Sequence, residues 1–350
     1  MKKTDDLRVA GYCELLEPRR LKLEVPISAA AIDSVLSARD GIQKILTKED
    51  KRLLIIVGPC SIHDEKAALE YARRLAVLRR KVSRTLFVVM RVYFEKPRTS
   101  VGWKGLVNDP NLDGSCDINE GLHKARRILL QIAEMGVPTA TEMLETITPQ
   151  YVSDLVSWAA IGARTAESQV HREMASGLSM PVGFKNATDG NLKAAINAMI
   201  AARTPQTFLG INQNGKTSIV KTGGNPVTHI VLRGGKRPNY DPISIEEARL
   251  GLIDKHLPEA IMVDCSHANS RKKFQGQEIV WKNIIEQRVS GNAALIGLML
   301  ESNLFEGNQK FSGSSASLRF GVSITDECIS WETTERLLLS THAKLADGAR

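Results

Sequence analysis

The sequence predicts an α/β protein built as a closed (β/α)8 TIM barrel, with an N-terminal extension and an inserted β-ribbon. Three observations support this fold. Short apolar runs alternate eight times with longer amphipathic stretches over about 300 residues. Most runs are apolar at consecutive positions, as expected for parallel strands that are covered on both faces. A polar or reactive side chain follows each run.

The apolar runs predict eight strands, at residues 53–57, 86–90, 139–141, 159–163, 181–184, 229–232, 260–263 and 294–300. The amphipathic stretches predict helices near residues 66–80, 120–135, 149–157, 168–177, 190–203, 244–256, 277–289 and 331–346. Thr148 followed by Pro149 is a favourable helix start, a capping side chain and then a proline in the first turn.

Two segments lie outside this alternation. Residues 1–48 precede the first strand and include an amphipathic helix, whose apolar face holds Ile32, Val35, Leu36, Ile42 and Leu46. Residues 207–225 predict an inserted ribbon with strands at 207–211 and 217–221. We therefore expect an extension over residues 1–48 that makes oligomer or effector contacts, and a catalytic barrel over residues 49–350. Structural padding is the alternative role for both additions.

Composition and charge exclude several classes of protein. The chain has 350 residues, of which 43% are hydrophobic and 25% charged, and no run approaches the roughly 18 apolar residues of a membrane span. The net charge is +8, but the clusters at residues 79–81 and 271–273 contain no aromatic side chains for stacking on bases. The first 20 residues lack the apolar segment of a secretory signal. We expect a cytoplasmic protein with no membrane or nucleic-acid partner.

The side chains that follow the predicted strands point to an anionic substrate. The C-terminal ends of barrel strands form the active site of this fold. They carry Cys60, Arg91, Glu142, Arg164, Lys185, Arg233, His267 and Glu301, and the turn at residues 95–99 adds Lys96 and Arg98. Clustered cations repel one another unless an anion fills the site, so we expect two phosphates or a phosphate and a carboxylate.

Four residues form a candidate metal site. Cys60, His267 and Glu301 follow the first, seventh and eighth strands, which adjoin when the barrel closes, and Asp326 lies beyond the last strand. One thiolate, one imidazole and carboxylate oxygens suit Mn²⁺, Fe²⁺ or Zn²⁺. Taken singly, Cys60 is more often a small buried residue and His267 a hydrogen-bonded core histidine. The five scattered cysteines contain no C-x-x-C pair, which argues against a disulfide framework or structural zinc.

One formal motif match is interpreted as a chance hit. Residues 210–217 fit the phosphate loop G-x-x-x-x-G-K-[ST], which works because a helix begins at its lysine. The residues that follow, Ser218 to Gly224, favour a strand and a turn instead. We expect a hairpin there.

Several longer segments closely resemble class I 3-deoxy-D-arabino-heptulosonate 7-phosphate (DAHP) synthase, in its feedback-regulated subfamily. The resemblance runs from about Asp5 to Trp331. It is carried by GPCSIHD (58–64), RVYFEKPRT (91–99), GWKGL (102–106), AIGART (160–165), PVGFKN (181–186), LRGGK (232–236), DCSH (264–267), ESN (301–303) and EGNQ (306–309).

The resemblance implies a transferase that condenses phosphoenolpyruvate with erythrose 4-phosphate and water and releases phosphate, the first step of aromatic amino-acid synthesis. It implies one divalent metal ion on Cys60, His267, Glu301 and Asp326. From the chemistry of the reaction we take Lys96 as the candidate that shares a proton with the aldehyde oxygen, and Asp326 or Glu142 as the candidate that accepts a proton from the water. The residues that match the phosphoenolpyruvate pocket are Arg91, Lys96, Glu142, Ala163, Arg164, Lys185 and Arg233, and those that match the erythrose 4-phosphate site are Pro97, Arg98 and Thr99.

The resemblance also implies a homotetramer, a dimer of dimers, that is inhibited by an aromatic amino acid. The matching effector residues are Asp5 and Asp6 of a neighbouring subunit with Ile147, Gln150, Met174, Leu178, Ser179, Phe208, Gly210 and Val220. Phenylalanine-sensitive members tend to carry serine where this chain has Gly210. Because glycine leaves room for a ring hydroxyl, tyrosine is the favoured effector.

Three alternatives are weighed against this assignment. A 3-deoxy-octulosonate 8-phosphate synthase would use a five-carbon sugar phosphate, but the Lys96–Thr99 segment and the long N-terminal arm favour the four-carbon enzyme. A nucleotide hydrolase would need a helix after Gly215. A nucleic-acid-binding module would need its positive charge outside the pocket.

Overall fold

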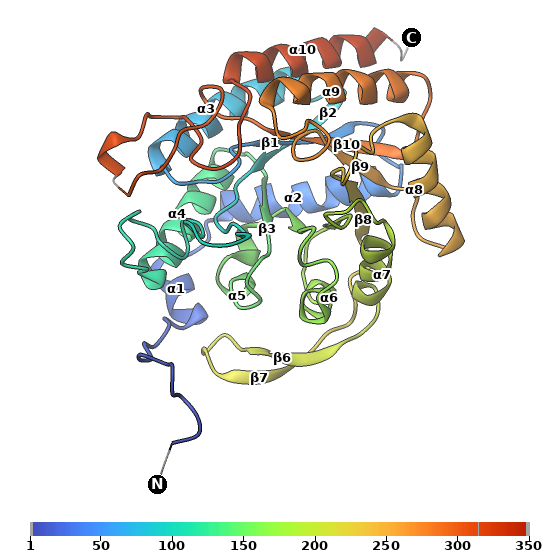
Figure 1. The fold of residues 1–350 in the computed structure, drawn as a ribbon. Helices are drawn as coiled ribbons and strands as arrows, with labels where there is room; N and C mark the ends of the chain where they lie inside the picture. The colour runs from blue at the N-terminus through green and yellow to red at the C-terminus, as the bar shows by residue number, and fades with distance from the viewer. Residues whose placement is uncertain (1–2, 314, 348–350) are drawn as a thin grey trace.

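Eight parallel strands close into a barrel in the computed structural model, which describes residues 3–313 and 315–347 (Figure 1). The hydrogen-bonded order around the barrel is β1-β10-β9-β8-β5-β4-β3-β2. The predicted (β/α)8 fold is therefore confirmed. The strands are β1 (Leu53–Gly58), β2 (Leu86–Arg91), β3 (Thr139–Glu142), β4 (Trp158–Ile161), β5 (Val182–Lys185), β8 (Thr228–Leu232), β9 (Ile261–Asp264) and β10 (Leu295–Glu301).

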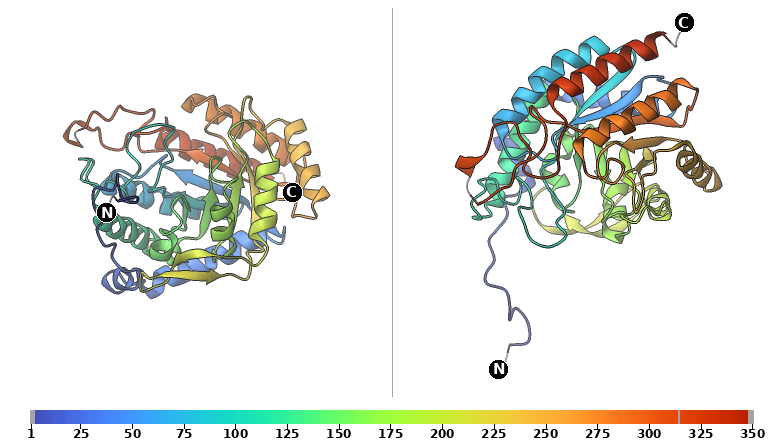
Figure 2. Two further views of the ribbon diagram at one scale, coloured as in Figure 1. Left: turned by 60° about the horizontal axis from the view of Figure 1, so that its bottom comes forward. Right: turned by 45° about the horizontal axis from the view of Figure 1, so that its top comes forward.

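A helix follows each barrel strand, and together these helices cover the outside of the barrel (Figures 1 and 2). Every predicted helix is present. They are α3 (Glu65–Val82), α4 (Ile118–Glu134), α5 (Pro149–Val152), α6 (Gln169–Ser176), α7 (Lys193–Ala202), α8 (Pro242–Asp254), α9 (Phe274–Val289) and α10 (Trp331–Asp347).

The third of these helices is shorter than predicted. It is a single turn, α5, followed by the 3-10 turn η1 (Ser153–Leu155). Thr148 is its N-cap residue and Pro149 its first residue, as predicted, but the Thr148 side chain makes no capping hydrogen bond. The Thr148 hydroxyl instead donates to Glu95 Oε1 at 3.2 Å, because a buried carboxyl group is available there as an acceptor.

The N-terminal extension contains α1 (Pro18–Glu24) and α2 (Ala29–Leu46). Ile42, Ile45 and Leu46 of α2 belong to the same buried cluster as side chains inside the barrel, so α2 closes the N-terminal end of the barrel. Gly41 permits this approach, since a Cβ atom there would lie 2.6 Å from the Phe87 ring.

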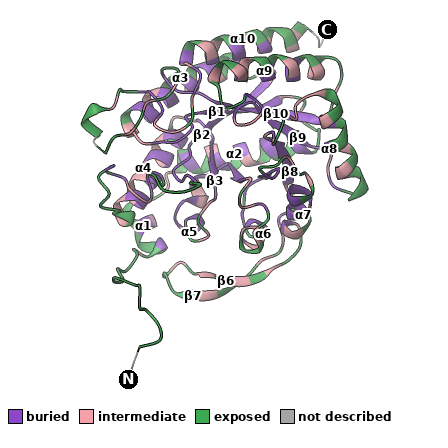
Figure 3. Cartoon of the chain, viewed as in Figure 1, coloured by how far each residue is buried: buried purple, intermediate pink, exposed green. Residues whose placement is uncertain are grey.

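The predicted apolar face of α2 is only partly correct. Val35, Ile42 and Leu46 are buried as expected. Ile32 and Leu36 are 39% and 57% exposed, because the barrel contacts only one side of the helix (Figure 3). Elsewhere burial follows the layers, with buried strands and helices that are exposed on their outer faces.

Large side chains fill the interior of the barrel. Trp158, Val231, Met262 and Met299 form one cluster there. The Trp158 ring N–H donates to Nε2 of His229 at 2.9 Å, and both side chains are fully buried. Burial lowers the pKa of His229 to about 4, so the ring is neutral at physiological pH.

The inserted ribbon is the antiparallel pair β6 (Thr207–Ile211) and β7 (Thr217–Lys221), with the predicted bounds. Its tip is a tight turn closed by a hydrogen bond from Asn212 N to Lys216 O. The phosphate-loop match therefore lies in a hairpin and opens no helix, as expected. Within the described part of the chain, no helix is both long and apolar enough to cross a bilayer.

The closure of the barrel by α2 predicts a large effect of one core truncation. Ile42→Ala should lower the free energy of unfolding by about 2–5 kcal/mol, because it leaves a cavity between α2 and the strands. Leu36→Ala, on the exposed side of the same helix, should change it by less than about 0.5 kcal/mol. Urea unfolding measures both, and equal losses would contradict the assigned orientation of α2.

The neutral His229 predicts a pH-dependent stability. In the unfolded state the His229 ring binds a proton with a pKa of about 6.5, whereas in the native state its pKa is about 4. The free energy of unfolding therefore falls as the pH is lowered from about 6.5 to about 4. The loss from this residue should total about 3 kcal/mol. His229→Gln keeps an acceptor for Trp158 without a titrating ring. Urea unfolding between pH 7 and 4 should show a steeper loss for the wild type, and parallel profiles would contradict this assignment.

Candidate active site

The carboxyl ends of the barrel strands bring the predicted site residues to one mouth. Arg91, Glu142, Lys185 and Glu301 are the last residues of β2, β3, β5 and β10. Strand pairing aligns Gly58 at the end of β1 with Glu301 at the end of β10. Cys60 follows β1 by two residues, and Glu301 ends the adjacent strand β10.

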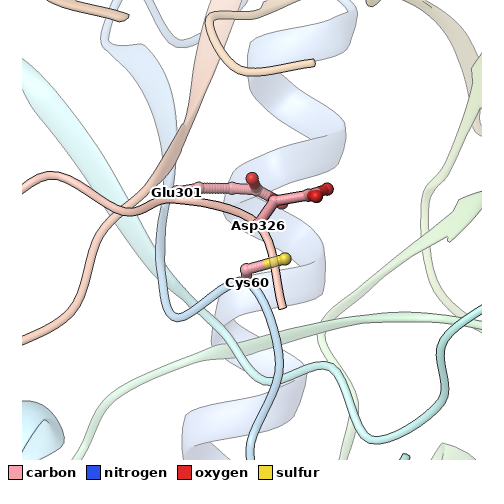
Figure 4. A group of neighbouring side chains, drawn as sticks. All are labelled: Cys60, Glu301 and Asp326. Carbon is pink, nitrogen blue, oxygen red and sulfur yellow. The ribbon is translucent and has the colours of Figure 1, made fainter. Parts of the chain in front are cut away.

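A thiol and two carboxylates meet at this point. Ligand atoms of Cys60, Glu301 and Asp326 all lie within 4.8 Å of one another (Figure 4). Cys60 and Glu301 are buried and Asp326 is exposed. The loop that carries Asp326 is held by a hydrogen bond of 2.8 Å between the hydroxyls of Thr325 and Ser61. One soft thiolate with hard carboxylate oxygens is a donor set for a divalent first-row transition metal.

Burial and charge control the protonation of the thiol. Burial raises the pKa of Cys60, and the neighbouring carboxylate of Glu301 raises it further. For Glu301, burial opposes ionisation, but Arg91, followed by His267 and Lys96, holds its pKa below the usual value. A cation that binds here must displace the thiol proton and finds the Glu301 carboxylate already charged.

His267, the predicted fourth ligand, lies outside the group of three but close to it. Its Nδ1 atom is 2.7 Å from Ser266 Oγ and 3.0 Å from Asp264 Oδ2. Both contacts are made by Nδ1, which leaves Nε2 for another ligand. His267 has a φ of +56°, an uncommon backbone conformation for a residue with a side chain.

Arg91 joins the thiol–carboxylate group to the cations of the mouth. Its Nη2 donates to Glu301 Oε1 at 2.9 Å, and both side chains are 1% exposed. The carbonyls of Pro59 and Cys60 accept further hydrogen bonds from the guanidinium group. The Tyr93 ring lies under it, with 3.6 Å between Cζ and the ring centroid. Four different contacts thus fix the orientation of this guanidinium.

Lys96 and Lys185 are also buried in the mouth. The Lys96 Nζ lies 5.6 Å from the Tyr93 ring centroid. Burial alone would lower the pKa of Lys96, but its acidic neighbours, first Cys60 and then Glu301, raise that pKa overall. Lys185 Nζ donates to Asp264 Oδ2 at 2.9 Å.

The remaining predicted mouth residues lie at the ends of three other strands. Glu142 ends β3, Ala163 and Arg164 follow β4, and Arg233 follows β8. A Cβ atom at Gly162 would collide with Glu142 Oε1, so the turn of residues 162–164 lies against that carboxylate. This turn includes Ala163. The backbone N–H of Arg233 donates to Asn186 Oδ1 at 2.8 Å. Burial lowers the pKa of Arg233, and Arg164 lowers it further, while Asp264 opposes the shift.

The Lys96–Thr99 segment connects the buried mouth to a surface pocket. Arg164 donates to Pro97 O and to Thr99 Oγ1, at 3.4 and 3.3 Å. Arg98 lines a cavity of about 400 Å³ whose walls include Trp103, Asn308 and Lys310. Glu95 precedes this segment, and its buried carboxyl has a pKa raised to about 8, first by burial and then by Glu145.

Several of the predicted effector residues lie in or beside the ribbon, away from the mouth residues. Phe208 and Val220 pair across β6 and β7, and a Cβ atom at Gly210 would lie 2.9 Å from Val220. Gln150 of α5 accepts a hydrogen bond from Gln213 at the ribbon tip, at 2.7 Å. The other residues are Ile147 just before α5, Met174 in α6, and Leu178 and Ser179 after α6. Asp5 and Asp6 lie in the N-terminal arm, which extends away from the barrel (Figures 1 and 2).

Asp264 and Tyr93 contact the mouth residues but were not singled out from the sequence. Asp264 is the last residue of β9, whereas the predicted site residue for this strand, His267, lies three residues further along the chain. An acidic residue that ends an otherwise apolar strand, as in Ile261–Asp264, is a usable signal for a site residue. Tyr93 gives no such signal, because an aromatic residue that follows a strand is usually part of the hydrophobic core.

Comparisons with known proteins identify the family of the chain. A sequence model of the DAHP synthetase I family matches residues 24–339. The Tyr-sensitive phospho-2-dehydro-3-deoxyheptonate aldolase of Salmonella typhimurium is 51% identical over 342 residues, covering 98% of this chain and 96% of that protein. The Phe-sensitive enzyme of Escherichia coli K12 is 53% identical over 336 residues, with 96% of each covered. The Trp-sensitive enzyme of Escherichia coli K12 is 52% identical over 338 residues, with 97% of each covered.

The same relationship holds in three dimensions. The structure of phospho-2-dehydro-3-deoxyheptonate aldolase from Francisella tularensis SCHU S4 superposes with a TM-score of 0.94 and 42% sequence identity, covering 97% of this chain and 98% of that chain. Family match, sequence identity and fold all extend over nearly the whole length. The chain therefore belongs to the DAHP synthetase I family.

Proposed function

We propose that this chain condenses phosphoenolpyruvate with erythrose 4-phosphate and water at the barrel mouth, giving DAHP and phosphate. The observation that carries the proposal is the buried contact between Arg91 and Glu301. It sets a group suited to anions directly against the Cys60–Glu301–Asp326 group, which is suited to a divalent cation. A site that holds both an anion and a metal is what this condensation needs.

The metal is assigned to Cys60, His267, Glu301 and Asp326, with Mn²⁺, Fe²⁺ and Zn²⁺ as the candidate ions. Three of these residues already converge, and the free Nε2 of His267 completes a mixed sulfur, nitrogen and oxygen set. When bound, the ion supplies a Lewis acid for the aldehyde oxygen of erythrose 4-phosphate.

Phosphoenolpyruvate is assigned to the cationic part of the mouth. Arg91, Lys96, Arg164, Lys185 and Arg233 bind its phosphate and carboxylate, with Glu142 and the backbone of Ala163 at the edge. Arg91 and Lys185 are already held in place by Glu301 and Asp264. These carboxylates reduce the mutual repulsion of the cations, and a doubly charged ligand removes more of it.

Erythrose 4-phosphate is assigned to Pro97, Arg98 and Thr99. Arg98 lines the surface pocket, and Lys96 separates this segment from the buried part of the mouth. The two substrates then lie on either side of Lys96 with both phosphates neutralised. Holding them in this order converts a bimolecular reaction into a step within one complex.

The chemistry follows from this placement. C3 of phosphoenolpyruvate bonds to the aldehyde carbon, and the aldehyde oxygen takes a proton from the Lys96 ammonium. Water adds at C2 and gives up one proton to Asp326 or Glu142. The C2–O bond to phosphate then breaks as the new C2 hydroxyl gives its proton to the departing phosphate, which leaves a ketone and inorganic phosphate. The proton held by the carboxylate replaces the one that Lys96 gave up. Burial of Lys96 excludes competing water from the proton transfer.

The effector site is assigned to the region beside the ribbon, in a homotetramer arranged as a dimer of dimers. Residues 1–48 make the oligomer and effector contacts, and Asp5 and Asp6 reach the site of a neighbouring subunit. The support is the direct link between the ribbon and α5, together with curated relatives named as sensitive to tyrosine, phenylalanine and tryptophan. Gly210 leaves space for a ring hydroxyl, so tyrosine is the assigned effector.

A phosphate-release assay tests the reaction and the metal together. Phosphate should be released only when both substrates are present. Its release should stop when EDTA is added and resume when Mn²⁺ is restored, because the metal and two anions share one mouth.

The same assay tests the effector. Tyrosine should inhibit phosphate release more strongly than phenylalanine or tryptophan. Phosphate release from phosphoenolpyruvate alone would contradict the condensation, and inhibition by phenylalanine alone would contradict the assigned effector.

Replacement of Lys96 tests the proton transfer. Lys96→Met keeps the length of the buried side chain but removes its proton, so kcat should fall by about 10²–10⁴-fold. Bound Mn²⁺ should remain, because the ligands are unchanged. Lys282→Met, on the exposed face of α9, serves as the matched control. Steady-state kinetics with metal analysis by mass spectrometry measures both, and a Lys96→Met kcat within threefold of wild type would remove the assignment.

A further inference from the structure

Asp264 is a buried carboxylate with more partners than any role assigned above requires. It is the last residue of β9, and its side chain has no solvent exposure. Oδ2 lies 2.9 Å from Lys185 Nζ and 3.0 Å from His267 Nδ1. Oδ1 accepts hydrogen bonds from the hydroxyl and the backbone N–H of Ser266, at 2.6 and 3.0 Å.

We propose that Asp264 is a positioning residue that serves the metal and the phosphoenolpyruvate site at once. Its Oδ2 fixes the His267 ring with the proton on Nδ1 and the lone pair on Nε2, directed to the metal. The same oxygen holds the Lys185 ammonium for the substrate anion. The inference rests on the metal role proposed for His267 and the substrate role proposed for Lys185.

The hydrogen bonds around His267 specify the tautomer of its ring. Both oxygens of Asp264 act as acceptors, because Oδ2 faces the Lys185 ammonium, which can only donate, and Oδ1 accepts from the Ser266 backbone N–H and hydroxyl. The Ser266 hydroxyl gives its proton to Asp264 Oδ1, so its oxygen accepts from His267. Both neighbours of Nδ1 are therefore acceptors, and Nδ1 must carry the proton. A metal-binding histidine in this position presents Nε2.

The backbone of the loop after β9 holds this arrangement in place. His267 adopts its positive φ while its carbonyl accepts from Lys272 N at 2.7 Å. Asn269 Nδ2 donates to the carbonyls of Asp264 and Leu232, at 2.9 and 3.2 Å, which ties the loop to β8 and β9. Such a conformation persists only where the surroundings determine it. Its effect here is to turn the ring back onto Asp264.

The bridge to Lys185 crosses a strand. β8 lies between β5, which carries Lys185, and β9, which carries Asp264. The contact therefore spans two strand ends across the mouth and is not a pairing of neighbours within the sheet. If Asp264 only stabilised the barrel, its contacts with His267 and Ser266 would not be needed. Because Asp264 contacts both Lys185 and His267, it links the position of the proposed substrate-binding lysine to that of the proposed metal ligand.

Asp264→Asn removes this double acceptor with almost no change of volume. An amide carries no negative charge for Lys185 and has only one accepting atom, so an NH2 group must face either the Lys185–His267 side or the two Ser266 donors. The Kd for Mn²⁺, measured by competition with a chromophoric chelator, should rise by about 10–100-fold. The KM for phosphoenolpyruvate at saturating Mn²⁺ should rise about tenfold, while kcat falls much less.

Two control variants separate positioning from general stability. Ser266→Ala keeps the Asp264 carboxylate and its contact with Lys185, so KM should stay within twofold of wild type and the Kd should rise less than in Asp264→Asn. Asp154→Asn breaks the contact of a buried arginine, Arg126, on the outside of the barrel. It should lower the melting temperature while Kd and KM stay unchanged. An Asp264→Asn protein with unchanged Kd and KM would overturn the proposal.

A measurement on the wild-type protein remains decisive if Asp264→Asn fails to fold. Long-range ¹H–¹⁵N correlation of the metal-free protein, with His267→Gln to assign the signal, should show the Nδ1–H tautomer. An Nε2–H tautomer would overturn the proposal. His267→Gln also tests the site itself. If it binds Mn²⁺ as tightly as wild type, the proposed metal site is wrong; if it loses Mn²⁺ while Asp264→Asn does not, only the positioning role fails.

Discussion

The ion pair between Arg91 and Glu301 is the contact on which the rest of the active site depends. Two groups that are 1% exposed meet there at 2.9 Å, and burial removes both from bulk solvent. A buried pair of this kind is weak evidence for stability, but the loss of one partner leaves an uncompensated charge. The Arg91–Glu301 pair instead fixes the positions of its two groups. It holds a guanidinium suited to an anion against a carboxylate suited to a metal, at the ends of β2 and β10.

The barrel supplies the rigidity that this concentration of charge requires. Arg91, Lys96, Lys185 and Arg233 crowd one end of the barrel, while α2 and the large side chains of the interior close the other. Repulsion among the cations raises the free energy of the empty site, and the packed core offsets that cost. Carboxylates at the ends of β9 and β10 hold two of the cations in place before any substrate binds.

The eight strands and the ribbon were predictable from the sequence because parallel barrel strands are apolar on both faces, and Leu53–Gly58 illustrates this pattern. Contacts between segments that are distant in the sequence could not be predicted in this way. The Thr148 hydroxyl donates to Glu95 and makes no capping hydrogen bond in α5, and Leu36 faces solvent because the barrel reaches only one side of α2. The mouth residues could be listed from strand ends, but the double contact of Asp264 arises from the loop geometry at His267, which no local pattern encodes.

The account rests on one mouth that holds a divalent ion and an anionic substrate side by side. The most direct measurement is a crystal structure with Mn²⁺ and phosphoenolpyruvate, with the ion located by anomalous scattering. We expect the ion bound to Cys60, His267, Glu301 and Asp326, and the substrate anion bound to Arg91 and Lys185. An ion bound elsewhere, or a substrate far from Arg91, would contradict the account.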